Sequence, residues 1–314
     1  MTKDELKNFA MAALPVLYDL APIQITPESA VPGMQSEIDE LLNLNCPDVL
    51  WKRLNYFQVP KSTEHDFEER FYDIGRDKLF LAGIRHLNSS VDRPFIHILL
   101  GFTPTLADLT KIEDLARKNF QVFSPKHLGL WLRPSLGCAR SLEEKGLATR
   151  RYIVGRVQSL IQRPLPSGYE RIELERTTDT FDYTWYETAY NEFHTENPEL
   201  KHWVPRAEKE ELQKCADENL LFQVKIDGVL AGLIGGFAEP ILGHTAVYIT
   251  TTLITRPFKR QGLALAIQRK FLDLAPSRYE LVWGTIDAKN LPSTKTALKI
   301  GRVPIRTEYF LPLG

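Results

Sequence analysis

The sequence predicts a mixed α/β (α+β) fold in two domains. Its 314 residues are 43% hydrophobic and 25% charged, values typical of a globular chain long enough for two cores. Helical and strand-like hydrophobic patterns alternate along it. The stretch QRPLPSGYE, residues 162–170, concentrates two prolines and a glycine, so we place the boundary there, between domains over 1–162 and 168–314.

Composition argues against several classes of protein. A formal net charge of -1 disfavours a surface built for nucleic acid. Cys46, Cys138 and Cys215 lie far apart and offer neither a disulfide framework nor zinc spacing, so we expect a reducing compartment and no metal. No apolar run approaches the roughly 18 residues of a membrane span. We therefore expect a cytoplasmic protein without membrane or nucleic-acid partners.

The first half begins with helical patterns and continues with strands. SSVDRP, residues 89–94, is typical of a loop between two strands. Helices are predicted over 2–20, 35–44, 46–56, 106–119 and 151–162. Strands are predicted over 79–87, 94–102, 120–124 and 127–132.

The second half gives a clearer order, β-α-α-β-β-β-α-β-α-β. Asp227-Gly228 is a hairpin signal between two strands within 221–237. The other strands are predicted over 171–177, 244–255, 279–286 and 305–313. The helices are predicted over 183–193, 206–219, 262–274 and 293–300.

A basic turn, TRPFKRQGLALAIQRK, opens the helix that starts near Gly262. Backbone N–H groups at a helix start have no intrahelical partners, and together with the helix dipole they favour an anion. Gly262 supplies a positive φ or room for close approach. Lys259 and Arg260 add charge where a diphosphate would lie. Arg269 and Lys270, deep in the helix, are interpreted as a solvated face.

This turn resembles the acyl-CoA pyrophosphate loop of the GNAT acetyltransferases, [RQ]-x-x-G-x-[GA]. The matching residues are Lys259, Arg260, Gln261, Gly262, Leu263 and Ala264. IDAKNLPSTKTALKIGR resembles the family's later cofactor motif, and the order of elements resembles the GNAT fold over 169–314. The residues that match this later cofactor motif are Asn290, Ser293, Ala297 and Gly301.

The resemblance implies a GNAT-like mixed central sheet flanked by helices and an acyl-CoA-dependent N-acyltransferase. Acetyl-CoA, or another acyl-CoA, would be the co-substrate, and a small-molecule or peptide amine the acceptor, attacking the thioester directly. It further implies that Leu253, Ile254 and Thr255 contact pantetheine, that the backbone near Ile254 donates to the oxyanion, and that Asn290 belongs to the cofactor site.

The sequence departs from the family at the general acid. Ala297 stands where many members have a tyrosine that protonates the departing thiolate, and Arg302 stands in place of an aromatic residue. Ser293, one turn earlier on the same helical face, is our candidate catalytic residue. The alternative is that its hydroxyl satisfies a backbone N–H at the helix start.

The general base has several candidates. We assign Glu187 and Glu239 to catalysis, although a lone carboxylate or imidazole is more often a surface or packing residue. The other candidates are His194, Glu196, His202 and His244. Hydroxyls of residues 250–252, where some relatives have a carboxylate, offer a relay through water instead.

Two alternatives concern the whole protein. Residues 79–132 resemble the later part of a GNAT core, so the first half is either a degenerate copy in a tandem GNAT protein or an unrelated α/β cap on the acceptor side. The second half is either an acyltransferase or a binding module that has retained the CoA loop and lost turnover.

Overall fold

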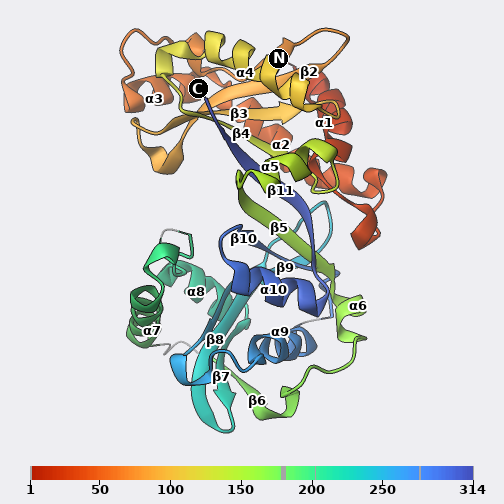
Figure 1. Ribbon diagram of the computed structural model, residues 1–314, viewed down its shortest axis with the longest axis vertical. Coiled ribbons are helices and arrows are strands. Elements are labelled where there is room, and N and C mark those ends of the chain that lie inside the picture. Colours follow the sequence, from red (N-terminus) through yellow and green to blue (C-terminus); the bar gives the residue numbers. More distant parts are fainter. Residues whose placement is uncertain (1, 178–181, 202, 276, 314) are drawn as a thin grey trace. The chain divides into compact units, whose positions relative to one another are not determined.

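The computed structural model describes residues 2–177, 182–201, 203–275 and 277–313 (Figure 1). Two compact units divide it: unit 1 comprises Met1–Arg151 and Ile305–Gly314, and unit 2 comprises Tyr152–Pro304. Both are mixed α/β, as predicted. The sequence placed its boundary a little later, within 162–168.

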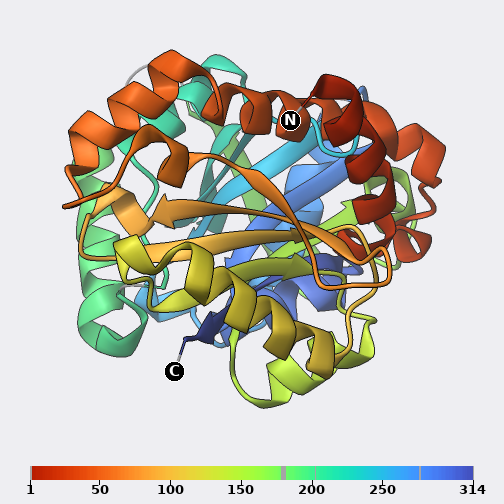
Figure 2. The same ribbon diagram turned by 90° about the horizontal axis from the view of Figure 1, so that it is seen from above.

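Unit 1 is a sheet with helices on both faces. Its strands follow the order β1-β2-β3-β4-β11, in which only β3 and β4 are parallel. Their bounds are β1 Arg70–Asp73, β2 Leu79–His86, β3 Pro94–Leu100, β4 His127–Leu132 and β11 Val303–Pro312. The helices are α1 Lys3–Leu17, α2 Pro27–Leu44, α3 Pro47–Phe57, α4 Leu106–Asn119 and α5 Gly137–Glu144. In Figure 2, α1 and α2 lie on one side of these strands and α4 lies on the other.

Unit 2 has the strand order β5-β10-β9-β8-β7-β6. Its β9–β10 pairing is parallel, and α9 forms the crossover between those two strands. The β6–β7, β7–β8 and β8–β9 pairings are antiparallel. The strands are β5 Ala148–Arg156, β6 Ile172–Arg176, β7 Leu221–Ile226, β8 Val229–Ala238, β9 Ala246–Ile254 and β10 Leu281–Asp287. The helices are α6 Val157–Ile161, α7 Tyr183–Glu196, α8 Lys209–Asp217, α9 Leu263–Leu274 and α10 Leu291–Ile300. From β6 to β11 the predicted order of ten elements is confirmed.

The two units repeat one order of elements. Unit 1 runs β1-β2-β3-α4-β4-α5 before β5, and unit 2 runs β7-β8-β9-α9-β10-α10 before β11. The last strand of each series passes into the other unit: β11 pairs with β4, and the end of β5 lies beside β10. A duplicated domain is expected to show this repeat.

Several predictions in the first half are wrong. Residues 151–156 are strand rather than helix, because Ile153 and Val154 are fully buried within β5. Residues 120–124 form a short 3-10 turn at Gln121–Phe123 instead of a strand. The prediction missed β1 and α5, and it started α2 too late because Pro32 lies inside that helix.

The interpretation of Arg269 as a solvated residue is also wrong. It is 8% exposed. Its guanidinium donates to the carbonyl oxygens of Ile161 and Arg163, the latter at 2.7 Å, and to Asp273 at 3.1 Å. It therefore holds the end of α6 against α9, where carbonyls at a helix end need donors.

We predict that Arg269→Met lowers the free energy of unfolding by about 2–4 kcal/mol, because it leaves two carbonyl oxygens without their donor and removes one of the donors to Asp273. Lys270→Met is the matched control, since the Lys270 ammonium lies only over the Tyr169 ring, at 3.9 Å. We expect that change to cost less than about 1 kcal/mol. Urea unfolding measures both, and equal losses would contradict this role of Arg269.

Candidate active site

The strands β9 and β10 separate soon after they meet. Their register joins only Leu281–Trp283 to Ala246–Tyr248, although β9 continues to Ile254 and β10 to Asp287. Gly284 is the first β10 residue beyond the last pair. A Cβ there would lie 3.1 Å from the Ile249 carbonyl oxygen. The later halves of both strands are therefore not paired with each other, and we call this separation of the strands the parting.

Backbone groups of β9 line this parting. The Thr255 N–H donates to the Ala231 oxygen of β8 at 2.8 Å. Because N–H groups alternate along a strand, those of Thr252 and Ile254 point to the opposite edge, toward the parting. The β8–β9 register skips Thr250, which forms a bulge there.

The start of α9 lies just past the end of β9. Gly262, the N-cap, has φ 76°, and no side chain caps the helix. Arg260 also has a positive φ, 63°. Residues in this conformation before a helix direct successive N–H groups into one concavity, which binds anions. A Cβ at Gly262 would meet nothing within 4 Å, so the glycine is required for its φ rather than for space within the chain.

Two basic side chains of this turn, Lys259 and Arg256, form ion pairs with an acidic residue of α7. Lys259 Nζ lies 3.2 Å from Glu196 Oε2 and over the Phe193 ring, and Arg256 Nε lies 3.0 Å from Glu196 Oε1. Gln261 Oε1 accepts from Arg171 at 3.4 Å. A candidate anion site at this turn would therefore consist of backbone N–H groups, with Arg260 beside them.

The corresponding helix of unit 1, α4, has a closed N-terminus. Thr105 caps it, and Asp108 accepts hydrogen bonds from the Thr105 N–H at 3.0 Å and from Lys78 Nζ at 2.8 Å. These hydrogen bonds lower the pKa of Asp108 to about 2, so the carboxylate is ionised at neutral pH. A carboxylate already occupies the position that a phosphate would take, so α4 is not an anion site.

The helix α10 begins shortly after the end of β10. Asn290 is its N-cap, and Asn290 Oδ1 accepts from the Ser293 N–H at 3.2 Å. The alternative interpretation of the Ser293 hydroxyl as the cap is therefore wrong, since Asn290 has that role. Ala297 is fully buried against Ile153 and Ile286, so no phenol reaches the parting from that position.

The structure separates the two carboxylates assigned to catalysis. Glu187, on α7, forms an ion pair with Arg206. Glu239 follows β8 near the start of β9, away from Ile254, and its carboxylate lies 3.7 Å from Lys214. The catalytic assignment of both carboxylates stays an untested prediction.

The other base candidates are held in structural contacts. His194 Nε2 lies 2.9 Å from the Val204 oxygen, and His244 Nδ1 lies 3.0 Å from Glu280. Glu196 forms ion pairs with Arg256 and Lys259 of the basic turn. His202 lies outside the described residues.

Hydroxyl groups of β9 and β10 residues form hydrogen bonds near the parting. Tyr186 OH lies 3.1 Å from Thr251 Oγ1, and Tyr248 OH lies 2.9 Å from Thr285 Oγ1. Burial raises the pKa of Tyr186 far above its usual range, so it stays a neutral hydroxyl. Sequence analysis named residues 250–252 but missed the tyrosines, because α7 places Tyr186 on β9 only in three dimensions.

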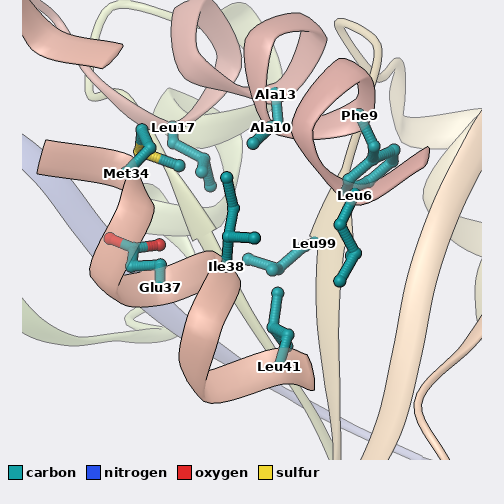
Figure 3. Close-up of a pocket in the computed structure, with 10 residues that line it drawn as sticks. All are labelled: Leu6, Phe9, Ala10, Ala13, Leu17, Met34, Glu37, Ile38, Leu41 and Leu99. Carbon is teal, nitrogen blue, oxygen red and sulfur yellow. The ribbon is translucent and has the colours of Figure 1, made fainter. Parts of the chain in front are cut away.

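One hollow lies in each unit of the described chain. In unit 1 a small gap among α1, α2 and Leu99 is lined by apolar side chains except for Glu37 (Figure 3). Glu37 already accepts from Tyr18 and Arg306, both at 2.8 Å, so the gap offers a ligand no polar partner. In unit 2 an open depression lies beside the start of α10. Its lining residues are Asn197, Glu199, Leu200, Trp203, Lys289, Leu291 and Pro292.

Across the described ranges, no helix combines the length and apolar character needed to cross a membrane. The same ranges contain no cluster of three or more His, Cys, Asp or Glu side chains that could hold a metal ion.

Comparison with solved structures finds similar chains over most of the length. A Drosophila protein is 13% identical, with 100% of this chain and 98% of that one covered and a TM-score of 0.44. A GCN5-related N-acetyltransferase from Sphaerobacter thermophilus is 13% identical, with 83% and 89% covered and a TM-score of 0.43. A tandem GNAT protein from the clavulanic acid biosynthesis pathway is 13% identical, with 86% and 97% covered and a TM-score of 0.41.

No curated protein matches the chain significantly. A family profile does match: residues 160–301 fit that of the Acetyltransferase (GNAT) family. The matched range lies within unit 2 and contains the parting, α9 and α10. Residues 160–301 therefore form a domain of the GNAT acetyltransferase family.

Proposed function

We propose that unit 2 is an acyl-CoA-dependent N-acyltransferase that transfers an acyl group, in the simplest case acetyl from acetyl-CoA, to an amine. The observation that carries this proposal is the parting of β9 and β10 beside the uncapped start of α9. The parting would accommodate the extended chain of the cofactor with its amide groups, and the start of α9 would accommodate the cofactor's diphosphate.

The cofactor would bind mainly through backbone groups. The N–H groups of residues 262–264 would hold the diphosphate, with Lys259, Arg260 and Gln261 at its rim. Pantetheine would lie along Leu253, Ile254 and Thr255, where its amides pair with the free edge of β9. Asn290, by capping α10, would fix the opposite wall of the site.

The reaction would proceed by direct attack. The amine nitrogen bonds to the thioester carbon, and the carbonyl electrons form an oxyanion that the N–H groups of Thr252 and Ile254 can stabilise. Such a donor typically contributes about 10²–10³ in rate. The C–S bond then breaks, and the thiolate leaves with the electron pair. A thiol is acidic enough to leave without a strong general acid.

Proton transfer would use hydroxyl groups and water. The amine loses its proton to a water held by the Thr251–Tyr186 and Tyr248–Thr285 pairs, which line the side of the sheet that faces α7. Ser293, near the start of α10, is our candidate for the group that hydrogen-bonds the sulfur.

The open depression beside α10 is our candidate for the acceptor site. It combines the Trp203 ring with the Glu199 carboxylate, both of which favour a cationic amine. Lys289 Nζ already lies 3.9 Å from the centre of the Trp203 ring, which shows that this face accommodates an ammonium group.

A binding module without turnover is the second candidate. Ala297 favours it, because that position offers no acid and is filled by packing against Ile153 and Ile286. The two candidates share the cofactor site and differ only in transfer, so separate experiments test them.

The first prediction concerns cofactor binding. Gly262→Glu should weaken CoA binding at least about tenfold, or about 1.4 kcal/mol, because its carboxylate repels the diphosphate. Gly228→Glu is a matched control: Gly228 has φ 78°, and a Cβ there also meets nothing within 4 Å. Calorimetric titration measures both variants, and equal weakening would show backbone strain rather than loss of an anion site.

The second prediction concerns turnover. Wild type mixed with acetyl-CoA should release free thiol when a suitable amine is added, and Gly262→Glu should reduce that release at limiting acetyl-CoA. A thiol-reactive dye follows the reaction across amino acids, polyamines, aminoglycosides and peptides. Silence across this panel, with CoA binding intact, would favour the binding module.

A further inference from the structure

Arg302 is a buried cation next to the parting. It is 3% exposed, and its Nε and Nη1 have no hydrogen-bond partner in the described chain. Its stem crosses β5 at Gly155, where a Cβ would lie 3.1 Å from Arg302 Cγ. Its Nη1 lies 3.8 Å from the position that a Cβ of Gly284 would occupy. Two glycines thus leave room for this side chain on the sheet.

The charge of Arg302 persists despite burial. Burial lowers the pKa of Arg302 to about 10, so the guanidinium is protonated at neutral pH. No ion pair joins it to a carboxylate in the described residues. A buried cation without a partner destabilises the folded state, whereas an apolar side chain there would pack at no such cost. This cost is offset when a ligand supplies the missing anion.

The neighbours of Arg302 point to the acyl end of the donor. If the proposed function holds, the diphosphate lies at Gly262 and pantetheine runs back along β9, so the acyl group ends where the strands meet, at Gly284. Thr252 and Ile254 lie on the α9 face of β9, because Leu253 between them packs toward α7. Thr252 Oγ1 is likewise buried without a partner.

We propose that Arg302 makes the donor site selective for an acyl-CoA whose acyl group ends in a carboxylate, a monothioester of a dicarboxylic acid. A guanidinium binds a carboxylate through two parallel hydrogen bonds, donated by Nη2 together with either Nε or Nη1. Nε and Nη1 of Arg302 both lack a partner in the described residues. Thr252 Oγ1 supplies a further donor nearby. The inference rests on the proposed function and adds the chemical class of the donor.

Calorimetry with acetyl-CoA, malonyl-CoA and succinyl-CoA tests this proposal. Wild type should bind at least one of the two acidic esters about tenfold or more tightly than acetyl-CoA. Arg302→Met should abolish that preference and leave acetyl-CoA affinity within about threefold, whereas Arg302→Lys should retain part of the preference. Arg163→Met is the control, because Arg163 is an exposed arginine that donates to the Lys299 oxygen near the end of α10, just before Arg302 in the chain.

The outcomes separate the two proposals. Equal affinity of wild type for all three esters would overturn the role of Arg302 and leave the proposed function standing. A preference that survives in Arg302→Met would overturn it too. Failure of wild type to bind any CoA ester would instead overturn the proposed function itself. The wild-type comparison decides the question even if Arg302→Met does not fold.

Discussion

The separation of β9 from β10 is the constraint on which the proposed site depends. Parallel strands ordinarily satisfy one another's backbone groups, so separating them after three residue pairs leaves buried polar edges that need other partners. Gly284 and the bulge at Thr250 lie where the separation begins. In the proposed function, an extended ligand with its own amide groups would restore the missing pairing.

The ends of two helices explain why unit 2 rather than unit 1 is suited to the cofactor. Both units place a helix between two parallel strands, and the start of each helix attracts negative charge. In unit 1 the carboxylate of Asp108 provides that charge, held by Thr105 and Lys78. In unit 2, Gly262 leaves the N–H groups of α9 uncapped. Similar topology therefore gives one helix start closed by a carboxylate and one left uncapped, where we propose that the diphosphate binds.

The sequence predicted local features well and long-range pairings poorly. The β-branched run of β9, the Asp227-Gly228 hairpin and the glycine turn each depend on a few adjacent residues, which made their order and type readable. The ion pairs of Glu196 with Arg256 and Lys259 join α7 to the turn across 60 residues or more, so no local pattern indicated them. The same holds for buried Arg269, whose partners come from α6. The sequence showed that position 297 carries no phenol, but it did not indicate that the guanidinium of Arg302 is buried.

A crystal structure with bound CoA tests the central claim most directly. Our account predicts diphosphate density against the N–H groups of residues 262–264 and pantetheine density between β9 and β10, paired with the backbone of Thr252 and Ile254. Density for CoA at the start of α4, or outside the parting of unit 2, would contradict it.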